Sequence, residues 1–302
     1  MVTQRKVRRE MKQTKKNSIW IADSCIACGS YSLVASPAIL MPFVAERALN
    51  WGPVDIDESW NLNDVKIGRA YTRVNSMGCI ACGTVFVDLR LGETQMARLY
   101  KDYRGDDYVS TRIKFEPHYQ QKNISFNEPY KHIPKVEAKI KDWIGVPQSV
   151  LDWGGGDGLN TPFRHVVENL FCYDISGVEL CEGVRKYRSE TAPDVFDLVV
   201  CCQVLEHVSS PMEVLTEVKK FMSHSSFLYL DFPFEKLMQT DKECSEMLKC
   251  KRHWHEHINF FSEAGVREIL KSAELDLVHL DVMEVGVDGS STKIFQVLCK
   301  LP

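Results

Sequence analysis

The chain has 302 residues, of which 44% are hydrophobic and 26% are charged, and its formal net charge is −4 at pH 7. This composition is that of a soluble globular protein with room for one large and one small domain, and no apolar run reaches the length that spans a membrane. The acidic balance argues against a nucleic-acid partner, which usually requires a basic surface.

Eleven cysteines are an odd number, and the chain begins without the apolar core of a secretion signal. We therefore expect a reducing, cytoplasmic environment in which the thiols stay free or bind metal. Residues 1–17 contain seven Lys or Arg side chains and almost no apolar ones, which predicts a disordered basic tail. An arm that binds RNA or a membrane surface is the alternative.

The sequence C-I-A-C-G occurs twice, beginning at Cys25 and again at Cys79. Two thiolates three positions apart can hold one metal ion when the turn between them is tight, and two such pairs complete a tetrahedral zinc site. The predicted zinc ligands are Cys25, Cys28, Cys79 and Cys82. Because sulfur would fill all four positions, this zinc would be structural. Buried or redox-active cysteines are the alternative, since the gap of about fifty residues exceeds the usual zinc-ribbon spacing.

The segment after the second cysteine pair alternates short predicted elements with a tyrosine-rich stretch. A strand is expected over Thr84–Val87 and a helix over Glu93–Tyr100. Residues 99–108 hold three tyrosines, an arginine and several acids beside one glycine, so they form either a lid over a substrate or an exposed linker. Apolar residues at helical spacing predict a further helix over Tyr130–Trp143.

Residues 150–160 read V-L-D-W-G-G-G-D-G-L-N and place a glycine-rich turn after a short apolar strand. Asp157 and Asn160 can cap the start of a helix, so strand, turn and helix predict a nucleotide site. A dinucleotide fingerprint would need a third glycine at Leu159, which disfavours NAD. The pattern is instead D-x-G-x-G-x-G. The predicted cofactor-binding residues of this turn are Asp152, Gly154, Gly155, Gly156 and Gly158.

Two later segments complete the predicted nucleotide site. Asp174 ends a short apolar run twenty residues after Gly154, where an acid at a strand tip can accept hydrogen bonds from both ribose hydroxyls. Residues 195–211 combine an apolar strand with a loop, and Gln203 leaves that strand at the cofactor end. Only about twenty residues separate Asp174 from Val195, which is short for a helix and a third strand.

The later elements predict a seven-stranded sheet whose last strand runs antiparallel to the parallel ones. The functional site is expected at the carboxyl ends of the parallel strands. The expected helices are Met212–Met222 and Glu263–Ala273, and the expected strands are Phe227–Asp231, Leu275–Val282 and Lys293–Cys299.

The glycine pattern, Asp174 and the strand with its loop at residues 195–211 occur in the order that resembles the class I S-adenosylmethionine (SAM) dependent methyltransferases. The resemblance implies an α/β, Rossmann-like methyltransferase sheet of seven strands, SAM as the cofactor, and Gln203 at the methionine end of SAM. The double C-x-x-C module, the tyrosine-rich segment and the following domain together resemble bacterial methyltransferases of sugar, lipopolysaccharide and capsule biosynthesis. This second resemblance implies a small zinc-binding domain ahead of the catalytic one.

The segment 251–261 reads K-R-H-W-H-E-H-I-N-F-F and concentrates the remaining chemistry. A sugar hydroxyl becomes a good nucleophile when a base removes its proton, and histidine titrates in the right range. The same W-H-E-H-x-N-F-F pattern recurs in the resembled family. The predicted base is His257, with His255 second and Glu256 orienting one of them. Alternatively these three side chains hold a catalytic metal, or they cap and brace the backbone.

The sequence therefore predicts a SAM-dependent methyltransferase that methylates an oxygen of a sugar, nucleotide sugar or glycan in surface-polysaccharide or natural-product biosynthesis. The predicted regions are a basic tail (1–17), a zinc-binding module (18–95), a tyrosine-rich lid or linker (96–130) and the methyltransferase domain (131–302). The expected partner is a small molecule, the cofactors are SAM and structural Zn²⁺, and no nucleic acid is expected. An RNA base methyltransferase and a non-catalytic binding protein are the alternatives, and the sequence does not indicate an oligomeric state.

Overall fold

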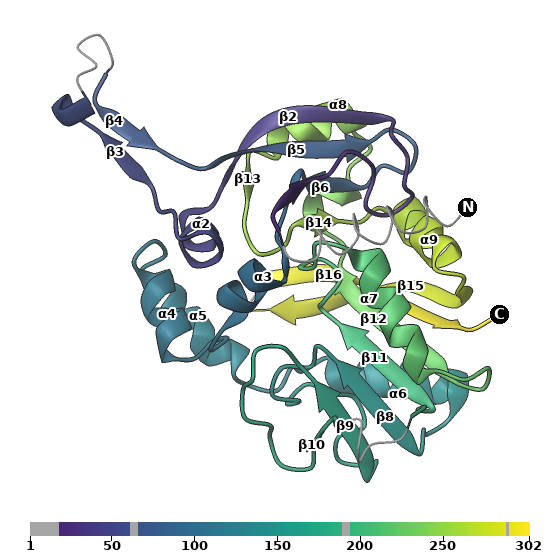
Figure 1. Ribbon diagram of the computed structural model, residues 1–302. Coiled ribbons are helices and arrows are strands. Elements are labelled where there is room, and N and C mark those ends of the chain that lie inside the picture. The colour runs from purple at the N-terminus through teal and green to yellow at the C-terminus, as the bar shows by residue number, and fades with distance from the viewer. Residues whose placement is uncertain (1–17, 61–65, 189–193, 288–289) are drawn as a thin grey trace, which may run out of the picture.

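The computed structural model describes residues 18–60, 66–188, 194–287 and 290–302, and its main sheet has seven strands (Figure 1). These are β8 (Ser149–Trp153), β9 (Asn169–Tyr173), β10 (Arg185–Lys186), β11 (Leu198–Cys202), β12 (Phe227–Pro233), β15 (Asp276–Val287) and β16 (Ser290–Lys300). Their order is β10-β9-β8-β11-β12-β16-β15, in which the first five run parallel and β16 lies antiparallel between β12 and β15. The predicted α/β sheet is therefore confirmed. The predicted tail, residues 1–17, lies outside the described residues.

Helices cover both faces of this sheet, which explains why its central strands are apolar throughout. The covering helices are α6 (Ile133–Ile144), α7 (Pro211–Val218) and α9 (Glu263–Ser272). Because side chains alternate along a strand, Leu198 and Val200 pack in one core with α6. Val199 and Cys201 pack in the other core with α7 and α9. The helices expected before β8, after β11 and after β12 are confirmed to within a few residues.

No helix follows the glycine turn, and here the prediction is wrong. Residues 157–168 form a run of turns between β8 and β9, where a helix starting near Asp157 was expected. Left-handed backbone at Gly158 and Phe163, with φ of +79° and +65°, interrupts helical hydrogen bonding in this stretch. The third strand is present but holds only Arg185 and Lys186. The chain between these strands is too short for complete strand-helix repeats.

A second sheet joins segments from the two ends of the chain. Its strands are β2 (Leu33–Leu40), β5 (Arg73–Cys79), β6 (Val85–Val87), β13 (His253–Trp254) and β14 (Asn259–Phe260), in the order β13-β2-β5-β6-β14. Trp254 is fully buried, and its Nε1 donates to Ser76 Oγ at 2.8 Å. Strands from the predicted methyltransferase domain therefore form both edges of the sheet that contains the cysteine module.

The tyrosine-rich segment is helical and packs into the molecule. Tyr108 and Tyr119 are buried in the same core as Phe43 and Trp254. The remaining helices are α2 (Pro42–Leu49), α3 (Glu93–Tyr100), α4 (Asp106–Ile113), α5 (Tyr119–Phe126) and α8 (Cys244–Cys250), with short 3-10 turns at Glu58–Trp60, Lys219–Phe221 and Lys236–Gln239. The remaining strands are the pair β1 (Trp20–Ile21) and β7 (Leu89–Arg90), and the projecting hairpin of β3 (Val54–Ile56) and β4 (Gly68–Ala70) (Figure 1). The bounds of α3 are those predicted.

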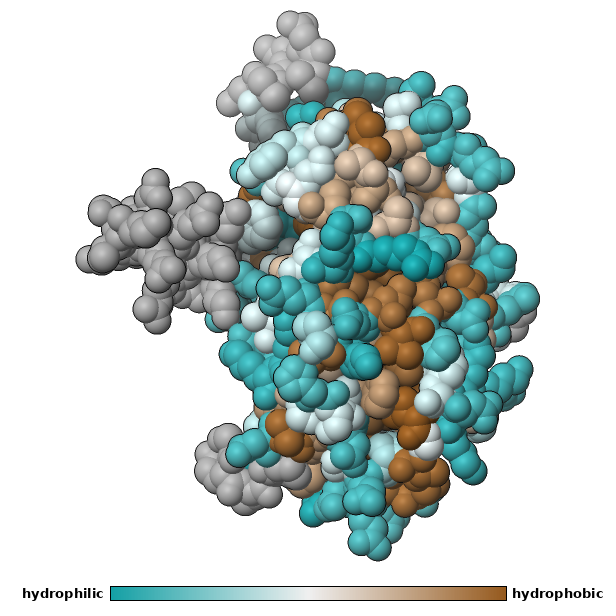
Figure 2. Space-filling view, turned by 90° about the vertical axis from the view of Figure 1, so that its right-hand side faces the viewer, coloured by the Kyte–Doolittle hydropathy of each residue, from teal (hydrophilic) through white to brown (hydrophobic). Residues whose placement is uncertain are grey.

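The face that carries α9 and the carboxyl terminus is turned toward the viewer in Figure 2, where apolar residues form a band bordered by hydrophilic ones. Val278 and Val282 of β15 are exposed large apolar residues, so this edge strand presents apolar side chains to solvent. Within the described ranges, no helix combines the length and the apolar composition needed to cross a membrane.

Candidate active site

The glycine turn after β8 has left-handed backbone at three of its glycines. The φ angles of Gly154, Gly156 and Gly158 are +82°, +61° and +79°, a region that other residues rarely adopt. A Cβ on Gly154 would lie only 2.5 Å from Cγ2 of Val204, whereas a Cβ on Gly156 would meet nothing within 4 Å. The turn is therefore packed on one side and open on the other, as a ligand-binding turn requires.

Two acidic residues flank this turn. Asp174 accepts hydrogen bonds from Gly156 N at 2.9 Å and from Ser176 N at 2.7 Å, one on each carboxylate oxygen. Asp152 accepts from the Thr161 hydroxyl through Oδ2, and its buried Oδ1 has no partner among the described groups. Burial raises the pKa of Asp152 to about 7, and the nearby acids add to this effect. The structure thus places both predicted acids at the glycine turn, each with free acceptor capacity.

A loop over residues 203–209 begins where β11 ends. Gln203 has a φ of +55°, unusual for a residue other than glycine and typical of functional loops. Its backbone N donates to Asp231 O at 2.8 Å, and its Nε2 donates to Asp231 Oδ1 at 2.9 Å. Burial raises the pKa of Asp231 to about 6. Gln203 is therefore held at the carboxyl end of β12, and the next residue, Val204, contacts the glycine turn.

The two predicted histidines lie in different environments, because the chain bends at Glu256. His255 Nε2 lies 2.7 Å from Glu116 Oε1, and its ring stacks on Phe43. Glu256 is buried and accepts hydrogen bonds from the Tyr108 hydroxyl and from Arg112 Nη1, the latter at 2.8 Å. Burial alone raises the pKa of Glu256, but the hydrogen bond from His255 and the Arg112 charge outweigh it and hold the pKa far below its usual range.

His257 meets a different group of side chains. Its Nδ1 lies 2.8 Å from Glu235 Oε1, and its ring packs edge-on against His207 with the centroids 4.7 Å apart. Glu206, His207 and His257 each offer one ligand atom, and these atoms lie within 4.8 Å of one another. Burial lowers the pKa of His257, but its hydrogen bond to Glu235 and the charge of Glu206 raise it by more.

Glu206 and His207 are both deeply placed in this group. Glu206 is 1% exposed, neither carboxylate oxygen has a hydrogen-bond partner among the described groups, and burial raises its pKa to about 8. His207 Nδ1 lies 2.9 Å from the Tyr100 hydroxyl and 3.1 Å from Glu256 O. Burial lowers the pKa of His207 to about 3, so its imidazole is neutral at physiological pH.

Three of these residues were not predicted from the sequence. Glu206 stands between the predicted cofactor residue Gln203 and His207, so its position in the loop was an available signal. Nothing in the sequence marks Glu235, because it meets His257 only through the fold. The same holds for the fully buried Arg90, which donates to the backbone oxygens of Val208 and Ser209 and to Asn259 Oδ1. Arg90 thus ties the loop over residues 203–209 to the second sheet.

The four predicted zinc ligands come together. Cys25 Sγ lies 3.6 Å from Cys82 Sγ, Cys28 Sγ lies 3.5 Å from Cys79 Sγ, and all four sulfurs are within 4.8 Å of one another. The two C-I-A-C-G turns have the same form, since Gly29 N donates to Cys25 O at 2.9 Å and Gly83 N donates to Cys79 O at 2.8 Å. The contact between Cys25 and Cys82 lowers the pKa of Cys82 and raises that of Cys25, so Cys82 is the member of this pair that ionises first.

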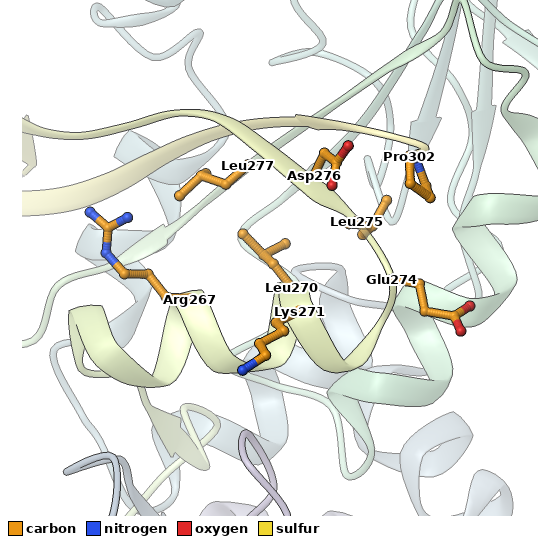
Figure 3. A pocket seen from close by; sticks show the side chains of 8 residues that line it. All are labelled: Arg267, Leu270, Lys271, Glu274, Leu275, Asp276, Leu277 and Pro302. Atoms are coloured by element: carbon orange, nitrogen blue, oxygen red, sulfur yellow. The ribbon is translucent and has the colours of Figure 1, made fainter.

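A surface hollow lies elsewhere, between α9 and the start of β15 (Figure 3). Leu270 points from the helix toward the strand, whereas Lys271 points away from it. The lining residues are Arg267, Leu270, Lys271, Glu274, Leu275, Asp276, Leu277 and Pro302. None of them belongs to the groups described above, so the hollow is not part of the candidate active site.

Comparison with solved structures gives distant similarities. The glycopeptide N-methyltransferase MtfA is 10% identical, with 57% of this chain and 91% of that one covered and a TM-score of 0.42. Magnesium protoporphyrin IX methyltransferase from Synechocystis PCC 6803 is 14% identical, with 61% and 86% covered and a TM-score of 0.39. The 1,6-didemethyltoxoflavin-N1-methyltransferase of Burkholderia thailandensis is 17% identical, with 65% and 90% covered and a TM-score of 0.43.

Comparison by sequence is more decisive. No curated protein matches the chain. A family model described as a methyltransferase domain matches residues 118–280, which are more than half of the 302 residues and include the glycine turn, Asp174 and the histidine segment. The chain therefore belongs to the methyltransferase-domain family and is a SAM-dependent methyltransferase.

Proposed function

We propose that this enzyme transfers the methyl group of SAM to a hydroxyl of a sugar, nucleotide sugar or glycan in surface-polysaccharide or natural-product biosynthesis. The observation that supports this proposal best is the set of contacts made by the loop over residues 203–209. This loop contacts the glycine turn through Val204 and holds Glu206 and His207 beside His257. One short loop therefore links the proposed cofactor turn to a histidine that can accept a proton.

The residues of the cofactor side fit SAM. Open space and left-handed backbone at Gly156 let a ligand approach the main chain closely. Each carboxylate oxygen of Asp174 keeps a lone pair for a ribose hydroxyl. The unpartnered Oδ1 of Asp152 can accept a hydrogen bond from the amino group of the methionine part. Gln203, fixed through its amide nitrogen, keeps its amide oxygen as a further acceptor at that end.

His257 is the proposed general base. When bound, SAM supplies an electrophilic methyl group, and the attacking hydroxyl must lose its proton. Glu235 accepts a hydrogen bond from Nδ1 of His257, so Nε2 carries the lone pair that can take this proton. The side chain of His257 is 39% exposed, which leaves it accessible to a substrate. The proton would thus move from the acceptor oxygen to Nε2 as the new carbon-oxygen bond forms.

His255 and Glu256 are proposed to position this segment. Glu256 is 9% exposed and is held by Arg112 and Tyr108 from α4, so its carboxylate is not available to a substrate. Glu116 holds His255 in the same way. These contacts fasten α4 and the turn after it to the two residues that precede His257. A shift in these contacts would therefore displace His257.

We also propose that the four cysteines bind a structural Zn²⁺. Zinc-sulfur bonds of about 2.3 Å place the sulfurs of a tetrahedral site about 3.8 Å apart. The pairs at 3.5 and 3.6 Å agree with this separation. With four sulfur ligands the metal has no position open to a substrate, so its role is to hold the two cysteine turns together.

The proposed function is tested by titrating the purified protein with S-adenosylhomocysteine in a calorimeter and then assaying methyl transfer to a panel of nucleotide sugars. We expect the parent protein and the control Asp276→Asn, altered at an exposed position on β15, to bind the ligand equally well. Asp174→Asn should bind at least tenfold more weakly, because a charged acceptor of the ribose hydroxyls is lost. A parent protein that binds the ligand but methylates no sugar in the panel would contradict the proposed acceptor class.

A further inference from the structure

Glu206, His207 and His257, here called the Glu206 cluster, have the chemistry of a cation site. Glu206 is 1% exposed, and neither of its carboxylate oxygens has a hydrogen-bond partner among the described groups. A buried carboxylate is normally paired with hydrogen-bond donors, cations or metal ions, because removing its charge from water is unfavourable. The buried carboxyl group of Glu206 therefore suits a position where a cation binds.

Both histidines of the cluster carry a lone pair on Nε2. Glu256 O, a carbonyl oxygen 3.1 Å from His207 Nδ1, can only accept a hydrogen bond, so Nδ1 carries the proton and Nε2 the lone pair. Glu235 imposes the same tautomer on His257 through its contact of 2.8 Å to Nδ1. Metal-binding histidines characteristically donate their other ring N–H to a carboxylate or a backbone carbonyl.

The spacing of the cluster suits a metal ion. His207 Nε2 lies 3.7 Å from Glu206 Oε1, and one ligand atom from each of the three side chains lies within 4.8 Å of the other two. An ion at about 2.1 Å from each ligand would need ligand atoms roughly 3 to 4 Å apart, so a small inward movement completes the site. Two imidazoles and one carboxylate favour a transition-metal ion over Mg²⁺ or Ca²⁺, which prefer all-oxygen sites.

We propose that the Glu206 cluster binds a divalent transition-metal ion such as Zn²⁺, separately from the four-cysteine site. The ion uses the Nε2 lone pair of His257, which is the atom assigned above as the proton acceptor. Metal and proton therefore compete, and an occupied cluster inhibits methyl transfer. This inhibition rests on the proposed function, whereas metal binding itself does not.

The test counts zinc by equilibrium dialysis of the full chain against micromolar zinc, followed by metal analysis. We expect two zinc ions per parent chain and one in Glu206→Gln, which keeps the shape of the side chain but removes its charge. The control Glu217→Gln, whose exposed side chain pairs with Lys220, should keep two. Cys25→Ser should lose the other ion and keep the one in the cluster. Equal zinc in the parent and in Glu206→Gln would overturn the proposal.

A second variant and a spectroscopic measurement test the same proposal independently. His257→Asn removes one ligand at a more exposed position, so it carries the comparison if Glu206→Gln does not fold. Cobalt added to protein that holds zinc only at the four-cysteine site should give weak visible absorption bands without the intense thiolate bands of a cysteine site. The weak bands should vanish in His257→Asn. If the parent binds the second ion but its methyl transfer is unaffected by that ion, the site stands and the assignment of His257 as the base fails.

Discussion

At the glycine turn, which is the proposed cofactor side, hydrogen bonds from backbone N–H groups hold the geometry between residues 154 and 176. The partners in these hydrogen bonds lie close together in the sequence. Around His257, the proposed acceptor side, buried polar and charged side chains hold one another across long sequence distances, as Glu256 does with Arg112 and Tyr108. The cofactor side therefore depends on which residues can adopt its backbone conformation. The contacts of Glu256 depend on every partner being present, because a buried charge left alone is destabilising.

The largest expected effect comes from the zinc proposed at the four-cysteine site. Cys25→Ser should lose the zinc of the four-cysteine site and several kcal/mol of stability, since structural zinc contributes about 10 kcal/mol or more in zinc-finger peptides. Cys250→Ser, at an exposed cysteine, is the matched control. Zinc content and urea unfolding measure the two effects. Zinc content and stability that remain unchanged in both Cys25→Ser and Cys79→Ser would exclude a structural zinc at this site.

The next effect is the loss of a buried charge on the acceptor side. Glu256→Gln should destabilise the protein by about 3 kcal/mol at neutral pH, because Arg112 loses a buried partner. Glu217→Gln, which breaks an exposed pair with Lys220, should change the free energy of unfolding by less than about 1 kcal/mol. Urea unfolding at neutral pH compares the variants.

The same variant has a defined pH dependence. The pKa of Glu256 lies lower in the folded chain than in the unfolded one, so its ionised form stabilises the fold above the unfolded value of about 4.5. This contribution is lost as the pH falls below that value. The stability difference between the parent and Glu256→Gln should therefore shrink on acidification. A difference that stays constant from pH 7 to pH 3 would show that the Glu256 charge is not what stabilises this side.

The smallest effects are expected for alanine substitutions at Gly154 and Gly156, two glycines of the turn after β8. Alanine at either position must adopt a positive φ, which costs about 1 kcal/mol. Gly154→Ala should be the less stable variant, because its Cβ would also press on Val204. Gly156→Ala should lose more S-adenosylhomocysteine affinity than stability, since the added methyl group enters the open side of the turn. Thermal unfolding and calorimetry together test this, and equal losses of both quantities in the two variants would contradict it.

The contrast between contacts that are close in sequence and contacts that are far apart also explains which features the sequence could predict. The glycine pattern and the C-x-x-C pairs were found because their meaning lies in short, fixed spacings, and the strands were found because they are continuously apolar. The prediction of a helix after Asp157 was wrong, because a capping pattern does not reveal how few residues separate β8 from β9. Glu235 and Arg90 could not be found, because their partners lie far along the chain and no local pattern specifies them.

Strands β13 and β14 were missed for a related reason. Each contains only two residues, too few to show the alternation by which a strand is recognised. β13 pairs with β2 and β14 pairs with β6, so residues from the predicted methyltransferase domain complete the sheet of the cysteine module. The division at residues 95 and 131 stays a prediction about sequence regions.

The order of strands in the second sheet, β13-β2-β5-β6-β14, has a consequence for the synthesis of the protein. Strands β2, β5 and β6 leave the ribosome long before residues 253–260, which supply both edges of their sheet. Until then the nascent chain exposes unpaired backbone on β2 and on β6, and such edges can pair with other chains. Pairing across so long a sequence separation is also slow. The amino-terminal region must therefore be kept from associating with other chains during synthesis, and a fragment that ends before residue 253 would keep both edges open.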